Sequence, residues 1–364
     1  MNWASLLITL AAIFDTAAAP APVVQVRPAP LRIASFHAGS VRCGGSEEIP
    51  VRAVAPLPVA AAVAEPAEPI RFGFRIDQEG RPLSIRQTGG TANPALDTRD
   101  LVPAMIAWRF APGAERSDCD IAFTVRFESV AAADKALLYR YAALGRMQMP
   151  DGGGGALVRE AFSRLRPRGT TCMTDPVPRE PINLPYQSIP EIPGGISFSF
   201  FSYDVDAQGR PAHLRLLHSS GNRMLDMAGD IALGRAVFPA QPRTGCLYYF
   251  YRYSTEAAPA PALTPIDLHP AGSACAGAIS DQVATRFQMR YPIEFTRRPA
   301  EGWVVFSYDV ETSGAVGNIR ILESEPAARF GEEVSRAAAV LRVDPISSAQ
   351  RGCVQRVRFQ LPPR

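Results

Sequence analysis

Cysteine is the residue type in this chain whose spacing points most clearly to chemistry. The six cysteines fall into three pairs of nearly equal separation, and each pair brackets a glycine-containing turn. No C-x-x-C motif for zinc or thiol exchange is present, and a catalytic cysteine would be expected once rather than in symmetric pairs. The regularity therefore predicts one disulfide in each of three units. The expected pairs are Cys43 with Cys119, Cys172 with Cys246, and Cys275 with Cys353.

The remaining reactive side chains do not form a recognised catalytic or metal-binding motif. Two histidines, His37 and His269, lie in spacer-like segments, and two others, His213 and His218, lie on or just after one strand-like run. The stretch HSSG at 218–221 falls where a loop is expected, and the glycine run PDGGGGAL lacks the Lys-Ser/Thr of a phosphate loop. We therefore expect no catalytic residue, no metal site and no cofactor.

The elements that position these residues are repeated. The word FSYDV begins two similar segments, 201–221 and 306–326, and a third copy begins FGFRI at 72–90. Each copy is a period-two run, a tight turn and a second period-two run, which is typical of a β-hairpin. The turn glycines are Gly80, Gly209 and Gly314.

A helical pattern and a last strand follow each hairpin. The helical patterns cover 95–110, 224–238 and 329–343, and a proline follows each of them. The last strands are expected at 119–127, 246–253 and 353–361. The sequence therefore predicts an α+β fold of three tandem β-β-α-β modules, each an antiparallel sheet covered by one helix.

Segments between the modules are predicted to be connectors. The apolar N-terminus followed by small residues is typical of a secretory signal peptide, and Pro/Ala-rich stretches are typical of spacers. The expected division is signal peptide 1–19, Pro/Ala spacer 20–40, module 41–130, helical and Gly-rich linker 131–168, module 169–255, Pro/Ala linker 256–268 and module 269–364. In an exported, periplasmic protein the disulfides would persist, each stabilising by roughly 4–5 kcal/mol in the chain-entropy model.

Two groups of side chains are candidates for a docking surface. Arginines follow the core position of each second hairpin strand and point away from the core, where a solvated sheet face is the simpler interpretation. The strand at 246–253 carries aromatic residues on both faces, which favours core or inter-domain packing and leaves partner binding as the alternative. The candidates are Arg86, Arg215, Arg320, Tyr249 and Tyr251.

Composition excludes some function classes. A net charge of only +3 over 364 residues gives no broad basic field for nucleic acid. A hydrophobic content of 47% and a charged content of 20% are typical of a folded protein. We expect a protein partner, with no nucleic acid and no small-molecule substrate.

The third module resembles the TonB C-terminal domain family. Its Tyr291-Pro292, Gly302-Trp303-Val304, Gly314 and Ala-rich helix occupy the positions typical of that family. The second module matches through Asp206 to Gly209 and the first through Asp77 to Gly80, both more weakly. The chain departs from TonB in showing no anchor helix with a membrane-embedded histidine and no Glu-Pro/Lys-Pro rod.

The resemblance implies a non-enzymatic periplasmic protein that binds an extended segment of an outer-membrane or periplasmic partner as an added strand, in TonB-related transport. An unpaired sheet edge offers N–H and C=O groups to such a peptide. The candidate edge is Val354, Gln355, Arg356, Val357, Arg358 and Phe359. The alternatives are a structural array of the cell envelope without receptor recognition and a secreted enzyme of unknown class.

Overall fold

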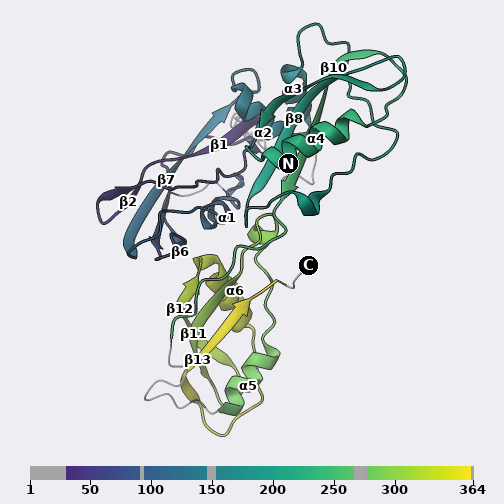
Figure 1. Cartoon of the computed structure of the whole chain (residues 1–364). Helices are drawn as coiled ribbons and strands as arrows, with labels where there is room; N and C mark the ends of the chain where they lie inside the picture. The colour runs from purple at the N-terminus through teal and green to yellow at the C-terminus, as the bar shows by residue number, and fades with distance from the viewer. Residues whose placement is uncertain (1–29, 91–93, 146–152, 266–274, 276, 362–364) are drawn as a thin grey trace, which may run out of the picture.

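The computed structural model describes residues 30–90, 94–145, 153–265, 275 and 277–361. They form three antiparallel sheets, one of seven strands and two of three. The third sheet and its helices lie at one end of the molecule, and the first two sheets lie together at the other (Figure 1). No helix in this part of the chain is long and apolar enough to cross a membrane. The expected signal peptide lies outside the described residues.

Each sheet contains the same β-β-α-β unit, which confirms the predicted α+β fold. In every unit the first strand lies between the second strand and the last strand. The units are β5 (Ile70–Ile76), β6 (Pro82–Gly89), α1 (Leu101–Ile106) and β7 (Arg116–Glu128); β8 (Ile196–Val205), β9 (Pro211–Ser219), α4 (Arg223–Gly234) and β10 (Arg243–Tyr253); and β11 (Gly302–Val310), β12 (Val316–Glu325), α6 (Ala328–Ala339) and β13 (Gln350–Phe359).

The turn glycine of each unit contacts the chain segment that follows the helix and holds it in place. Gly80, Gly209 and Gly314 have φ angles of +77°, +80° and +81°, a conformation that side-chain-bearing residues rarely adopt. A Cβ on any of them would lie 2.1 or 2.2 Å from the carbonyl oxygen of a residue just after the helix. That residue also donates its N–H to the glycine carbonyl, at 2.8 or 2.9 Å. The residues after the helices are Phe110, Phe238 and Val343.

The first sheet is larger because four short strands precede its repeated unit. They are β1 (Arg32–Ala38), β2 (Val41–Cys43), β3 (Ser46–Glu48) and β4 (Val59–Ala61). β1 pairs with β7 on one side and with β4 on the other. Residues 32–38 therefore belong to the sheet, and the prediction of a spacer over 20–40 is wrong for them. Ile33, Ala34, Ser35 and Phe36 are all buried, so β1 lacks the alternation that would have revealed it.

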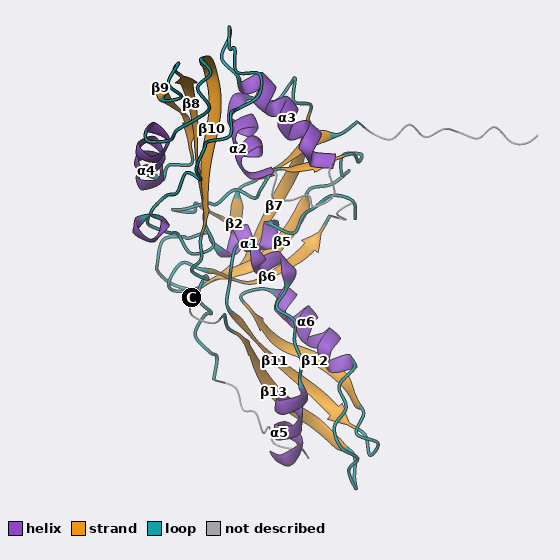
Figure 2. Cartoon of the chain, turned by 90° about the vertical axis from the view of Figure 1, so that its right-hand side faces the viewer, coloured by secondary structure: helices purple, strands orange, loops and turns teal. Residues whose placement is uncertain are grey.

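Two helices cover the second sheet on the face opposite α4. They are α2 (Lys135–Leu144) and α3 (Gly153–Leu165), and Figure 2 shows them across the sheet from α4. The rings of Tyr139 and Phe162 lie 5.0 and 5.4 Å from that of Phe200. Most of the expected linker at 131–168 is therefore a layer of this domain.

The third sheet has a thinner cover on the face opposite α6. Ala260 and Leu263 pack against Trp303, Val305 and Val354, and the Trp303 indole donates to the Pro261 carbonyl at 3.1 Å. Where it is described, the expected linker at 256–268 thus completes a core. Helix α5 (Gly277–Arg286) precedes the third sheet, and two short 3-10 helices are η2 (Tyr186–Ser188) and η3 (Ile293–Thr296).

The first and third units meet where β6 approaches the end of β12. The Ile85 N–H donates to the Pro326 carbonyl at 3.0 Å. The backbone N–H and the hydroxyl of Ser84 donate to the Glu325 carboxylate at 2.7 and 2.6 Å. Arg75 pairs with the same carboxylate at 2.9 Å, and Glu325 is only 4% exposed. These contacts join the middle of the β6 edge to the end of β12.

One arginine connects all three units. Arg298, 2% exposed, pairs with Asp100 of the first unit at 2.8 Å. It also donates to the carbonyl oxygens of Gly194, before β8, and Ala55, before β4, at 3.0 and 3.3 Å. The units therefore form one assembly and not separate beads on flexible linkers.

Candidate strand-addition site

The disulfides join the pairs that the spacing predicts. Cys43 is bonded to Cys119, Cys172 to Cys246, and Cys275 to Cys353. Each bridge ties the chain before a unit to the last strand of that unit. Three disulfides are typical of an oxidising compartment outside the cytoplasm.

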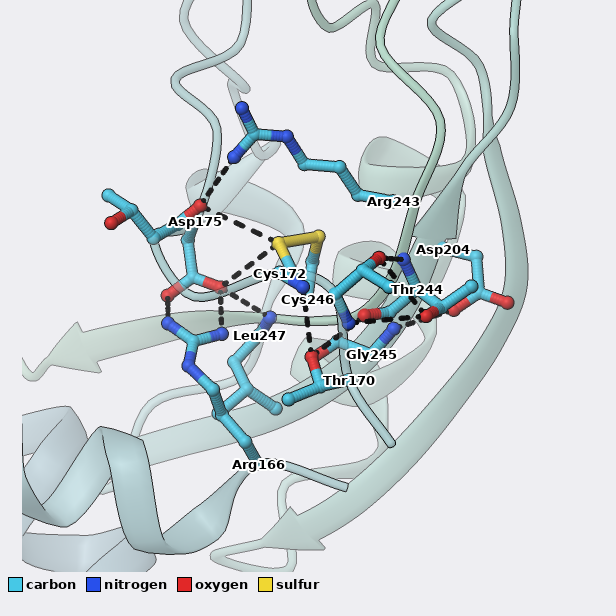
Figure 3. Close-up of a disulfide and its surroundings, with 12 residues drawn as sticks. Arg166, Thr170, Cys172, Asp175, Asp204, Arg243, Thr244, Gly245, Cys246 and Leu247 are labelled. Carbon is cyan, nitrogen blue, oxygen red and sulfur yellow. Dashed lines mark hydrogen bonds and ion pairs between the residues drawn. A yellow bond between two sulfur atoms is a disulfide. The ribbon is translucent and has the colours of Figure 1, made fainter. Parts of the chain in front are cut away.

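The surroundings of the second disulfide show how one strand edge is closed (Figure 3). Asp175 lies near both sulfur atoms, but these are bonded to each other and so offer no thiolate to a metal. Its carboxylate instead pairs with Arg166 at 2.8 Å and accepts the Leu247 N–H at 2.8 Å. Thr171 and Cys172 also donate backbone N–H groups to the Thr244 carbonyl. The first part of the β10 edge is therefore occupied.

Two longer edges differ in regularity. β9 and β13 each pair with one neighbouring strand among the described residues. The β8–β9 pairing contains two register shifts, whereas β13 pairs with β11 without a shift from Cys353 to Phe359. Bulges twist an edge and disfavour addition of another strand. β13 is therefore a better template than β9.

The repeat indicates which β13 groups face outward. Leu247 and Val354 occupy equivalent positions, paired with Ser202 and Ser307. Because Asp175 accepts the Leu247 N–H, that group points away from β8. Alternation along a strand then directs the N–H groups of Val354, Arg356 and Arg358 away from β11. The start of β13 is tied to Cys275, which precedes α5, so the stretch toward Phe359 is the more accessible part.

A carboxylate anchors the start of the same edge. Asp309 on β11 accepts the Gly352 N–H at 2.9 Å and the Asn318 amide at 2.7 Å, and pairs with Arg351 at 3.1 Å. Partial burial alone would raise the pKa of Asp309, but the hydrogen bonds from Asn318 and Gly352 and the Arg351 charge lower it. The carboxylate thus stays ionised and holds the bend just before Cys353.

The candidate docking residues lie on separate surfaces. Arg86, Arg215 and Arg320 are exposed on β6, β9 and β12, one on each sheet. Tyr249 stacks on Phe200 at 5.8 Å and faces α3, so it belongs to the core under the helical layer. Tyr251, 39% exposed, lines a groove of about 580 Å³ together with Met173 and Val177.

The histidines make contacts that could not be predicted from the sequence. His37 lies on β1, and its Nε2 is 2.9 Å from the Ser35 hydroxyl, a pair that i, i+2 spacing on a strand permits. No hydrogen bond to His37 Nδ1 is found among the described residues, so a third group orienting the imidazole is missing there. His218 stacks on Tyr139 at 5.3 Å, and its neighbour Ser219 donates to Asp226 instead. His269 lies outside the described residues.

No protein-family model matches this chain, and no curated protein sequence matches it.

Proposed function

We propose that this protein binds an extended segment of another protein along β13 and has no catalytic role. The observation that carries the proposal is that β13 is a regular strand, paired on one side among the described residues, with alternate N–H groups directed outward. An incoming strand gains main-chain hydrogen bonds from such an edge. The TonB-like sequence features of the third unit and the three disulfides support a periplasmic location and a partner in the periplasm or outer membrane.

The side chains along the edge suggest what an added strand would meet. Val354 faces the Pro/Ala cover, so by alternation Arg356 and Arg358 lie on that face as well. Arg356 already donates to the Thr264 carbonyl at 2.8 Å. Val357 and Phe359 pack on the α6 side with the core. The edge therefore offers backbone N–H donors between a cationic face, with Arg356 and Arg358, and an apolar face, with Val357 and Phe359.

Amide exchange and two substitutions at one position test this proposal. Twelve-residue peptides that bind the wild type would be selected from a displayed random library. Their affinity would then be measured for the wild type, R356P and R356Q. Proline removes an outward N–H but no β11 bond, whereas glutamine keeps the N–H and removes the charge. We expect R356P to weaken binding about tenfold or more and R356Q to weaken it less. Among the backbone amides of β13, a bound peptide should slow the hydrogen exchange of Val354, Arg356 and Arg358 only.

Two results would reject strand addition. One is undiminished binding by R356P. The other is selected peptides that bind without slowing the exchange of those amides.

A rigid structural array is the second candidate function. The Arg298 junction and the β6–β12 contact hold the three units together, as a scaffold requires. In that case no peptide of the displayed library would bind along β13.

A further inference from the structure

A cavity of about 520 Å³ lies between the first and second units, within the size range of small-molecule sites. Its walls come from the chain before β4, from α2, and from the loops that flank β8 and α4. Three arginines line it: Arg52, Arg140 and Arg298. Carbon-rich side chains, among them Leu57 and Phe198, line the rest.

The negative charges at this cavity are already engaged. Asp100 pairs with Arg298. Glu191 pairs with Arg252 and accepts the Ser254 hydroxyl at 3.0 Å and the Thr255 N–H at 2.7 Å. Both carboxylates thus form their ion pairs with other arginines, although the charge of Asp100 also acts on Arg140.

Arg52 and Arg140 have only carbonyl partners. Arg140 donates to the carbonyl oxygens of Ala55 and Pro56, both at 2.6 Å, and Arg52 donates to that of Ala107 at 3.1 and 3.3 Å. Neither forms an ion pair within the described part of the chain. Burial, followed by the charge of Arg298, lowers the pKa of Arg140 to about 10, against the opposing charge of Asp100, and burial lowers the pKa of Arg52. Both guanidinium groups remain charged near neutral pH, and a partly buried cation without an ion-pair partner is costly.

From this lining we infer that the cavity binds a small phosphate-bearing molecule whose dianionic group is attracted by Arg52 and Arg140. Two guanidinium groups match the charge of a phosphate monoester, and their planar forks suit its oxygens. Ser220 lines the same cavity, and its oxygen accepts the Phe198 N–H at 2.8 Å, which leaves the hydroxyl proton available as a donor. The apolar part of the wall suits an organic substituent. No small-molecule substrate was expected from the sequence, in which these residues lie in distant segments and form no motif.

Calorimetric titration with two phosphate probes tests the inference on the full chain. Inorganic phosphate should bind saturably, against chloride at equal ionic strength, and phenyl phosphate should bind more tightly. R140Q and R52Q should each weaken phosphate binding about tenfold or more. R215Q, which removes an exposed arginine on β9, is the matched control and should leave binding unchanged.

The outcomes separate clearly. Loss of binding in R140Q and R52Q but not in R215Q supports the site. No saturable phosphate binding, or equal weakening in all three variants, overturns it. Equal affinities for the two probes would reject the organic substituent. Removal of Arg140 relieves a buried charge, so R140Q should fold; if it does not, R52Q alone decides. Strand addition at β13 is unaffected by either result.

Discussion

The third and first units use the same backbone position in opposite ways. The fourth residue of the repeated word is Asp309 in the third unit, where it accepts hydrogen bonds from Gly352 and Asn318 of its own unit. In the first unit that position is Arg75, which pairs with Glu115 of its own unit at 2.7 Å and with the buried Glu325 of the third unit at 2.9 Å. A duplicated position thus serves internal structure alone in one copy and also assembly in the other.

The backbone around this position is the same in all three units. Ser84, His213 and Asn318 are equivalent and have φ angles of 54°, 51° and 49°, each at a register shift between the first two strands. In the second unit Asp204 accepts from Gly245 at 2.8 Å and contacts His213 at 2.9 Å, as Asp309 does with its partners. Only the first unit has no carboxylate at this position of the word. The bulge is therefore common to all three units, whereas the charge at this position and its partners differ.

Removing Glu325 should have the largest effect. E325A leaves the Ser84 N–H and part of Arg75 without a partner at a buried contact, so we expect a loss of about 3–4 kcal/mol in the free energy of unfolding. D309A removes a more exposed carboxylate and should cost about 1–2 kcal/mol. Urea denaturation of both variants measures the difference. Equal losses in the two variants would mean that the carboxylate between units stabilises the fold no more than the carboxylate within one unit.

A double-mutant cycle sharpens the same comparison. Arg75 and Glu325 should couple by about 1–3 kcal/mol, because they touch at 2.9 Å. The matched control cycle combines E325A with R336A, an exposed arginine on α6 that pairs with Glu333, and should show coupling near zero. Strong coupling in the control would point to a general rearrangement instead of a direct contact.

Acid should weaken the second unit through Glu191. Burial alone would raise the pKa of Glu191, but the hydrogen bonds from Arg252, Glu256, Ser254 and Thr255 lower it to about 2. The unfolded-state pKa is higher, so this stabilisation is complete above about pH 4.5 and is lost as the pH falls toward 2. We expect roughly 2 kcal/mol to disappear over this window in the wild type. E191Q should be less stable at neutral pH and show a shallower acid slope in chemical denaturation.

The repeated units could be predicted because their words, turn glycines and cysteines recur at nearly equal spacing along the chain. The word FSYDV and the paired cysteines were sufficient for the β-β-α-β order and for the disulfides. The structure of the connectors was harder to predict from the sequence. The segment that includes Leu263 has the composition of a spacer, and only its contact with Trp303 shows that it completes a core.

Long-range polar contacts could not be predicted from one sequence. Glu325 and Arg75 are 250 residues apart, and neither lies in a motif that specifies a partner. The same holds for Arg298 and Asp100, which are 198 residues apart. The candidate edge was placed on the last strand of the third unit because that unit resembles the TonB family most clearly. In the structure β13 pairs with one neighbouring strand among the described residues, and strand addition there stays a prediction.

The exposed arginines should show the smallest effects and can sharpen the contrast between units. Arg215 and Arg320 occupy equivalent positions on β9 and β12, and both are exposed. R215Q and R320Q should each change the free energy of unfolding by less than about 0.5 kcal/mol, because neither removes a buried contact. Peptide affinity measured on the same variants then tests docking on these faces. If R320Q weakens peptide binding as much as R356P does, the partner contacts the β12 face and the β13 edge is not the sole site. If both variants bind peptide like the wild type, the repeated arginines are solvated surface.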